Sequence, residues 1–330
     1  MNEHDLTFDA MGSHVRFLLG EGGEDSPPAS AAAQDARRFV EDFDRRLSRF
    51  RAESELCALN EDPREVVPAS DLLRDAVRSG LRAAERTGGL IDPTLVGEIE
   101  SAGYRSSRAG MKGAPLAEAL RAAPPRRAAA PSPEARWRLF EIDDEAGTVA
   151  RPPGLRFDTG GTGKGLAADM VAARFRGYPR FIADCGGDIR IGGPDALARP
   201  YEIYVEHPLT GGHAHVLRLG FGAVATSGIN VRIWRREDGS FFHHLLDPCT
   251  GEPAWTGLVG VTALGDTALE AETICKAALL SGPDGGRELL ADRGGLLVHE
   301  SGRVEPVGPL AIAPPRIRWP EPAEPARSAA

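Results

Sequence analysis

The stretch Phe157-Asp158-Thr159-Gly160-Gly161-Thr162-Gly163-Lys164-Gly165 carries the strongest structural signal in this chain of 330 residues. It places four glycines and one lysine within residues 160–165, and an apolar run compatible with a helix follows at residues 166–175. Glycines let the backbone approach a ligand closely, and the amide groups at a helix start attract anions. A lysine adds a compact charge that suits a phosphate. The stretch therefore predicts a phosphate-bearing ligand at a junction between a loop and a helix.

The spacing of this loop matches neither a Walker loop nor a dinucleotide-binding glycine fingerprint. A tight turn from a strand into a helix, without any ligand, is the alternative interpretation. Asp158 stands at the end of the expected strand. It would either orient the loop or bind a ligand hydroxyl.

Lysine is rare in this chain. Only three of the 39 basic residues are lysines, namely Lys112, Lys164 and Lys276. Arginine is planar and bulky, whereas lysine carries a compact charge on a flexible stem, so a lysine is expected where arginine would not fit. A solvated surface lysine is the alternative, and it applies to Lys112 more than to the other two.

The bulk properties exclude several function classes. A net charge of −9 gives no electrostatic case for binding nucleic acid or an anionic membrane. No apolar run reaches the roughly 20 residues of a membrane helix, and the acidic N-terminus lacks a signal-peptide core. The four cysteines are widely spaced, without a Cys-x-x-Cys pair, which argues against a disulfide framework or a zinc site. We expect a cytoplasmic protein.

Strand and helix patterns mix along the chain without regular alternation, which favours an α+β fold over a doubly wound sheet. Helices are predicted at residues 32–47, 70–87, 166–175 and 268–281, the second capped by Ser70 or Asp71 and ended by Gly88-Gly89. Strands are predicted at residues 14–19, 155–157, 181–184, 201–206, 215–219, 223–226, 241–246, 257–264 and 296–299, with a hairpin at 138–142 and 148–150. Residues 104–136 are interpreted as a variable insertion with one short helix.

Three further motifs have both a chemical and a structural interpretation. Gly186-Gly187-Asp188 permits close approach to a flat ring, but is as readily a hairpin turn. Thr226-Ser227-Gly228 offers two hydroxyls, but is typical of a turn. His244 and Asp247 form either a base with its orienting carboxylate or a structural pair.

Glu272 and Lys276 have the spacing of neighbours on one helix face. An ordinary surface ion pair is the plain interpretation of this spacing. The functional alternative is a carboxylate and a cation that face a pyrophosphate.

Taken together, these segments resemble the ApbE family, the FAD:protein FMN transferases. The resemblance rests on seven motifs in order: Met11-Gly12-Ser13, residues 47–60 around Phe50-Arg51-Ala52-Glu53-Ser54-Glu55-Leu56, Gly89-Leu90-Ile91-Asp92-Pro93-Thr94, residues 158–169, Gly186-Gly187-Asp188-Ile189-Arg190, Thr226-Ser227-Gly228 and His244 to Pro253. It is weak at residues 104–136 and in the tail.

The resemblance implies a single bilobal, T-fold-like domain over residues 1–315, with mixed sheets and helices and an FAD cleft between the lobes. Residues 316–330 are expected to form a disordered tail. A Ser or Thr hydroxyl of an unidentified target protein would attack the FMN phosphorus, and AMP would leave. A divalent ion, usually Mg²⁺, would bridge the pyrophosphate.

The same resemblance assigns site residues. It implies FAD contacts at Met11, Phe50, Leu90, Ile91, Asp92, Asp158, Gly161, Lys164, Thr226, Ser227, Gly228, His244 and Cys275. It implies His244, Asp247 and Lys276 as catalytic residues, and Gly163 and Glu272 as metal ligands.

The late helix departs from the family pattern. Glu272 stands where relatives carry an Asp ligand, and Lys276 stands where they carry a Thr ligand. A charged lysine cannot ligate Mg²⁺. Our hypothesis is an FAD-binding protein whose lysine ammonium occupies the place of the metal. FMN transfer is the leading function, and FAD hydrolysis or flavin binding without transfer are the alternatives.

Overall fold

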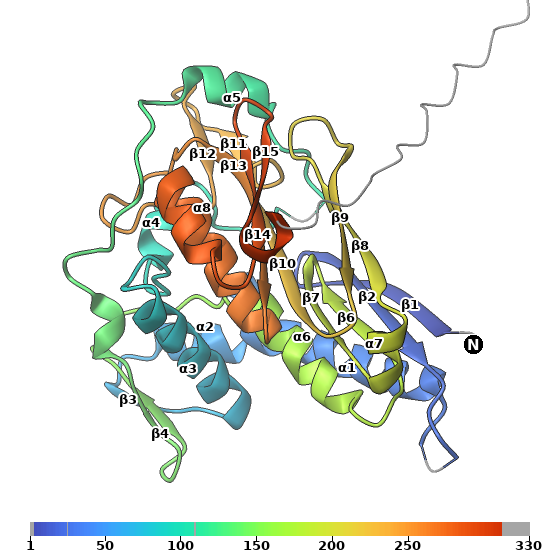
Figure 1. Ribbon diagram of the computed structural model, residues 1–330. Coiled ribbons are helices and arrows are strands. Elements are labelled where there is room, and N and C mark those ends of the chain that lie inside the picture. The colour runs from blue at the N-terminus through green and yellow to red at the C-terminus, as the bar shows by residue number, and fades with distance from the viewer. Residues whose placement is uncertain (1–2, 25, 109, 312–330) are drawn as a thin grey trace, which may run out of the picture.

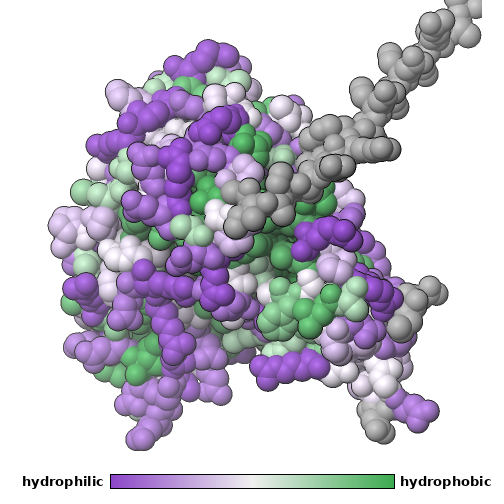
Figure 2. All heavy atoms as spheres, in the orientation of Figure 1, coloured by the Kyte–Doolittle hydropathy of each residue, from purple (hydrophilic) through white to green (hydrophobic). Residues whose placement is uncertain are grey.

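A computed structural model describes residues 3–24, 26–108 and 110–311. The tail predicted at 316–330 lies outside the described residues. In the described part of the chain, no helix has the length and hydrophobicity to cross a membrane. Figure 2 shows a face dominated by hydrophilic residues, with hydrophobic residues in small groups between them.

The centre of the fold is an eight-stranded sheet with the order β1-β2-β6-β7-β10-β13-β14-β15, in which every neighbouring pair is antiparallel. Its strands are β1 (Glu3–Ala10), β2 (Ser13–Gly20), β6 (Phe181–Cys185), β7 (Asp188–Gly192), β10 (Gly222–Gly228), β13 (Leu258–Gly265), β14 (Gly295–His299) and β15 (Val304–Val307). The mixture of this sheet with helices confirms the α+β prediction. Strand β1 was not predicted, because His4, Asp5 and Asp9 interrupt its apolar residues.

The two faces of the sheet carry different layers (Figure 1). Helices α1 (Ala29–Leu47), α6 (Gly163–Arg174) and α8 (Ala268–Leu290) pack on one face. The hairpin of β8 (Tyr201–Glu206) and β9 (His213–Leu219), with α7 (Pro194–Ala198), covers the other face. Successive strand residues point to opposite faces, so Ala183 joins the core under the helices, whereas Ile182 joins the cluster under the hairpin.

Helix α8 is longer than the predicted segment 268–281. Gly282 adopts a left-handed φ of 72° and Pro283 follows, which produces a kink. The helix then resumes and ends at Leu290. The sequence signals at Gly282 therefore mark a bend rather than the end of the helix.

A smaller layer lies beside α8. It consists of α2 (Glu55–Glu61), α3 (Asp71–Arg86), α4 (Val96–Ser101), η1 (Arg136–Leu139) and the three-stranded sheet β3-β5-β4, formed by β3 (Val66–Pro68), β5 (Thr148–Ala150) and β4 (Glu141–Asp143). The remaining elements are α5 (Leu116–Ala122), β11 (Ile233–Arg235), β12 (Phe241–His243) and η2 (Gly308–Ala311).

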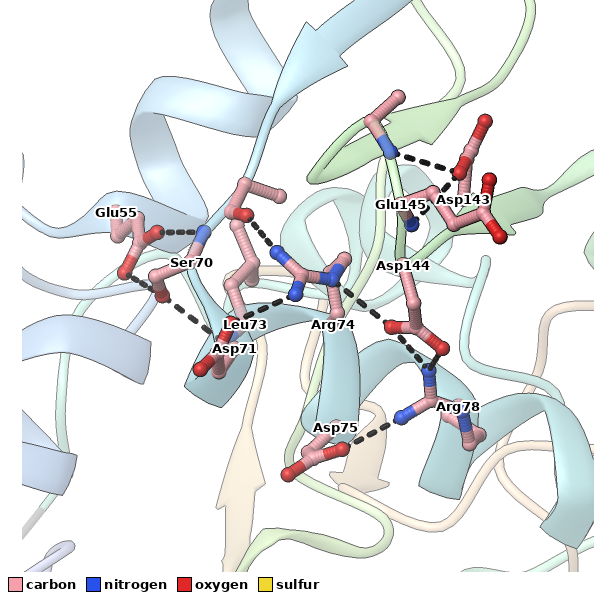
Figure 3. A network of polar contacts seen from close by, with 12 residues as sticks. Glu55, Ser70, Asp71, Leu73, Arg74, Asp75, Arg78, Asp143, Asp144 and Glu145 are labelled. Atoms are coloured by element: carbon pink, nitrogen blue, oxygen red, sulfur yellow. Dashed lines mark hydrogen bonds and ion pairs between the residues drawn. The ribbon is translucent and has the colours of Figure 1, made fainter.

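Ion pairs connect α3 to the turn between β4 and β5 (Figure 3). Arg74 Nε donates to Asp144 Oδ1 at 3.0 Å, and Arg78 Nη2 donates to Asp144 Oδ2 at 2.7 Å. At the helix start, Ser70 Oγ accepts from Leu73 N at 3.2 Å, which is the predicted cap. These contacts fix the orientation of α3, which packs against α1, α6 and α8.

The strand predicted at residues 155–157 is wrong. The Asn60 side chain takes both backbone groups of Phe157: its Oδ1 accepts from Phe157 N at 2.7 Å and its Nδ2 donates to Phe157 O at 2.8 Å. Because a side chain has replaced a strand partner, the segment stays irregular on its way into the glycine-lysine loop.

Arg151 is a buried cation that binds backbone oxygens. Its guanidinium donates to the carbonyls of Leu59 at 2.6 Å, Asp62 at 2.7 Å and Arg64 at 3.0 Å, and the side chain is among the largest that are fully buried. Burial lowers the pKa of this guanidinium. The Arg151 side chain therefore supplies hydrogen-bond donors to the backbone carbonyl oxygens of an irregular loop that has no strand partner.

Replacing Arg151 with methionine is expected to lower the free energy of unfolding by about 2 kcal/mol, because buried carbonyl oxygens lose their donors. Urea denaturation followed by tryptophan fluorescence measures this loss. The same substitution at the exposed Arg138 is the matched control. An equal effect at both positions would contradict the assigned role.

Candidate active site

A cleft of about 1380 Å³ opens beside the glycine-lysine loop. Its wall brings together segments that lie far apart in the sequence: residues 9–14, 43–51, 90–95, 158–164, 184–187, 231–232 and 244–246, together with Lys276 and Leu280. A cavity of this size accommodates a large ligand.

Ten of the residues predicted as FAD contacts or catalytic groups line this cleft: Met11, Phe50, Leu90, Ile91, Asp92, Asp158, Gly161, Lys164, His244 and Lys276. Gly163, one of the two predicted metal ligands, lines it as well. Residues from six of the seven motifs thus meet at one place.

Met11 is held at the cleft by a tight turn between β1 and β2. Met11 and Gly12 both have positive φ values, of 53° and 65°, and Ala10 pairs with Ser13 across the turn. A left-handed conformation is uncommon for a residue other than glycine. Strands β6 and β7 pair antiparallel on either side of Gly186-Gly187, which is therefore a hairpin turn, and it lines the cleft. This turn packs against the first one, because a Cβ on Gly186 would come within 2.5 Å of the Ser13 side chain.

The glycine-lysine loop leads into α6 as predicted, and α6 begins at Gly163. Thr162, at the cap position, makes no side-chain capping bond. Instead, Glu272 Oε2 from α8 accepts from Gly165 N at 2.8 Å. A Cβ on Gly165 would lie 2.7 Å from the backbone of Ala268 and Leu269, so only glycine lets α6 approach the start of α8 this closely. Glycine at position 165 therefore serves helix packing.

Asp158 orients the loop from its first residue. Its carboxylate pairs with Arg49 Nε at 3.3 Å and accepts from Gly160 N at 3.0 Å. The Arg49 guanidinium also lies over the rings of Phe50 and Tyr104, with its central carbon 4.2 and 4.8 Å from their centroids. Arg49, Phe50 and Tyr104 all line the cleft, and a cation beside two aromatic rings suits a planar ring system.

Three lysines line the cleft. Lys112 is exposed at its rim, whereas Lys164 and Lys276 are each held by a buried carboxylate. Lys164 Nζ lies 2.6 Å from Asp188 Oδ2 and donates to Gly186 O at 3.1 Å. Lys276 Nζ donates to Glu272 Oε1 at 2.5 Å. Both carboxylates are 0% exposed, whereas the lysine side chains keep 17% and 8% of their surface.

These contacts have opposing effects on the pKa values of the cluster. Burial lowers the pKa of Lys164, but the charges of Asp188 and Glu272 reverse this, and the net direction is upward. Burial raises the pKa of Glu272, and the ammonium of Lys276 opposes this shift. Lys164 therefore stays cationic, which suits an anionic ligand.

His244 faces the cleft, but Asp247 does not orient it. The Asp247 carboxylate accepts from Ala130 N and Cys249 N, both at 3.1 Å, and so stabilises a turn. His244 Nδ1 is buried without a hydrogen-bond partner among the described residues. Burial, with the charge of Arg232, lowers the pKa of His244 well below its ordinary value. His244 is therefore a neutral imidazole near pH 7.

Four residues predicted to contact FAD lie outside the cleft wall. Thr226 Oγ1 is 3.0 Å from Thr262 Oγ1 across two strands. Ser227 N donates to Cys275 Sγ at 3.1 Å, and this thiol donates to Val261 O at 3.0 Å. Gly228 ends β10 at the same place. These residues join β10, β13 and α8, and their contact with a ligand stays a prediction.

Asp184 and Arg232 line the cleft without having been predicted. Burial raises the pKa of Asp184 to about 6, although its bond from Gly187 N opposes this. Asp184 directly precedes the Cys185-Gly186-Gly187 turn, so its place at a strand end was the available signal.

The metal position implied by the resemblance does not fit a divalent ion in this chain. Both oxygens of Glu272 are engaged, by Lys276 Nζ and by Gly165 N. A lysine ammonium has only donors and cannot serve as a ligand. The described residues also contain no group of three or more His, Cys, Asp or Glu side chains arranged to hold a metal.

Comparisons with known proteins agree with the fold and the motifs. The FAD:protein FMN transferase of Haemophilus influenzae is 24% identical over 300 residues, which cover 87% of this chain and 82% of that protein. The FAD:protein FMN transferase of Vibrio cholerae is 27% identical over 279 residues, covering 83% of this chain and 79% of its own.

Solved structures resemble this fold over nearly its whole length. The ApbE protein of Thermotoga maritima superposes with a TM-score of 0.77 at 24% identity and covers 94% of this chain and 99% of its own. The apo flavinyl transferase ApbE of Pseudomonas stutzeri gives a TM-score of 0.73 at 22% identity, with 93% and 95% covered. The sequence profile of the ApbE family matches residues 11–298, so this chain belongs to the ApbE family.

Proposed function

We propose that this protein is an FAD:protein FMN transferase, which moves FMN from FAD to a Ser or Thr hydroxyl of a target protein and releases AMP. The observation that carries the proposal is the cleft itself. In a chain of the ApbE family, it joins an aromatic wall around Phe50 to two lysines beside the start of a helix. A flavin and a diphosphate need these two environments.

The reaction is a displacement at phosphorus. The hydroxyl oxygen of the target forms a bond to the FMN phosphorus, and the bond from that phosphorus to the bridging oxygen breaks. AMP leaves with that oxygen, and FMN remains on the target as a phosphoester. Positioning and charge stabilisation supply most of the catalysis in such reactions.

The roles of individual residues follow from their contacts. Lys164 neutralises phosphate charge next to the amide groups at the α6 N-terminus. The neutral imidazole of His244 accepts the proton of the attacking hydroxyl. Phe50 and Tyr104 stack on the flavin, and Asp158 keeps the loop in place. The proposed mechanism includes no step that uses Mg²⁺. The cytoplasmic location stays a prediction from the sequence.

Covalent flavin on a target protein is the decisive measurement. The purified protein is incubated with FAD and a soluble extract, and flavin fluorescence that survives denaturing electrophoresis is assigned to a residue by mass spectrometry. Lys164→Met is expected to slow transfer about 100-fold, because a phosphate loses its charged donor. Lys112→Met, at the exposed rim of the cleft, is the matched control.

The two alternative functions give different results in the same experiment. AMP release without any labelled target indicates FAD hydrolysis, in which water replaces the hydroxyl. A yellow protein that neither labels a target nor releases AMP indicates flavin binding alone. Either result would overturn the proposed transfer.

A further inference from the structure

Lys276 and Glu272 form a buried ion pair, not the surface pair that their spacing also allowed. Their side chains are 8% and 0% exposed. Removing two charges from water costs more than an exposed pair does, and their attraction repays this only with further hydrogen bonds. Glu272 has one such bond, from Gly165 N. Packing alone does not explain why this pair sits among the buried residues of α8, next to Ala271, Cys275 and Ala277.

The exposed part of this pair lies on the cleft side. Lys276 lines the cleft, whereas Glu272 lies behind it, within the core between α6 and α8. Lys164 on α6 and Asp188 on β7 form a second pair of this kind, with the lysine at the cleft and a fully buried carboxylate behind. The cleft therefore meets two cationic groups, each held in place from the protein side.

The two pairs are linked through the start of α6. Glu272 binds Lys276 with one oxygen and Gly165 N with the other, and Gly165 directly follows Lys164. Both lysines thus present their charge next to the same helix N-terminus. A diphosphate at this place would meet two ammonium groups and a favourable helix dipole.

We propose that the ammonium of Lys276 takes the place of a divalent cation, so that Lys164 and Lys276 together hold the diphosphate of FAD without a metal ion. This inference rests on the proposed use of FAD. It also accounts for the engaged oxygens of Glu272, which positions the ammonium instead of coordinating a metal. Lysine suits this place better than arginine, because its charge is compact and its three donors rotate freely.

FAD binding, measured by calorimetry with EDTA or with Mg²⁺, tests the inference independently of transfer. The protein is expected to bind FAD with the same affinity, within about twofold, in both buffers. Lys276→Thr removes the ammonium and frees Glu272 Oε1. In EDTA its affinity is expected to fall about 30-fold, the size of a lost charge-assisted hydrogen bond. Mg²⁺ is expected to restore about tenfold of this loss, since a carboxylate and substrate phosphates are typical Mg²⁺ ligands.

Control variants separate this effect from general charge and from misfolding. Lys112→Thr removes a lysine from the exposed rim and is expected to weaken binding by less than about threefold, whatever the buffer. Glu272→Gln with Lys276→Met removes both charges together and keeps the packing. It is expected to fold and to bind FAD weakly with or without Mg²⁺.

The possible outcomes are distinct. If the unaltered protein binds FAD only with Mg²⁺, the inference is wrong while the proposed function stands. If Lys276→Thr binds as tightly as the unaltered protein in EDTA, Lys276 does not contact the diphosphate and the inference is again wrong. If FAD binds under no condition, the proposed function itself fails.

Discussion

Replacing Glu272 with leucine is expected to lower the free energy of unfolding by about 3–5 kcal/mol, the cost of leaving a buried charge without its partner. Lys276 would keep a charge at 8% exposure without its carboxylate partner. Gly165 N would lose its acceptor at the start of α6. Urea denaturation followed by tryptophan fluorescence measures the effect.

The double variant Glu272→Leu with Lys276→Met separates charge from packing. It places two apolar side chains where the ion pair stood, so most of the lost stability is expected to return. Equal stability of the single and the double variant would show that the buried charge of Lys276 is not the cause.

Acid is expected to destabilise this protein through His243. The side chain is fully buried, and its Nδ1 accepts from Leu245 N at 3.3 Å. Burial lowers its pKa to about 3, from an ordinary value of 6.5. Below about pH 6.5 the imidazole therefore binds a proton in the unfolded chain but not in the folded protein. The free energy of unfolding decreases as the pH is lowered. Between pH 7 and pH 4 this single group removes about 3 kcal/mol.

His243→Gln removes the titrating group and keeps an acceptor. Its stability is expected to fall by about 3 kcal/mol less than that of the unaltered protein between pH 7 and pH 4. His213→Gln, at an exposed position, is the matched control and should leave the pH dependence unchanged. A His243→Gln variant as acid-sensitive as the parent would exclude His243 as the cause.

Local signals in the sequence were sufficient for most elements. Ser70 before α3 and Gly88-Gly89 after it mark helix ends by capping chemistry, and both ends were predicted to within one residue. Phe157 was mispredicted, since its partner is Asn60, a side chain from a distant segment. No local pattern reveals that a side chain has taken the place of a strand.

In the candidate site too, local motifs were predictable from the sequence, whereas contacts between distant segments were not. The glycine-lysine loop and Lys276 were predicted from their motifs, and both lie at the cleft. The spacing of Glu272 and Lys276 predicted their ion pair, but not its burial. The pairing of Lys164 with Asp188 depends on how α6 and β7 pack, and the sequence did not reveal it. His244 and Asp247 show the converse, because their short separation suggested a contact, whereas the turn directs Asp247 to the backbone of Ala130.

The strand order also has a consequence for synthesis on the ribosome. Strand β2 pairs on one side with β1, its neighbour in the chain, but on the other side Val15 pairs with Cys185. The first hairpin therefore emerges with an unpaired edge that stays open until β6 has left the exit tunnel. An open edge of this kind invites pairing with other nascent chains. Chaperone dependence should thus be greatest for chains stalled before β6 and should fall once that strand has emerged.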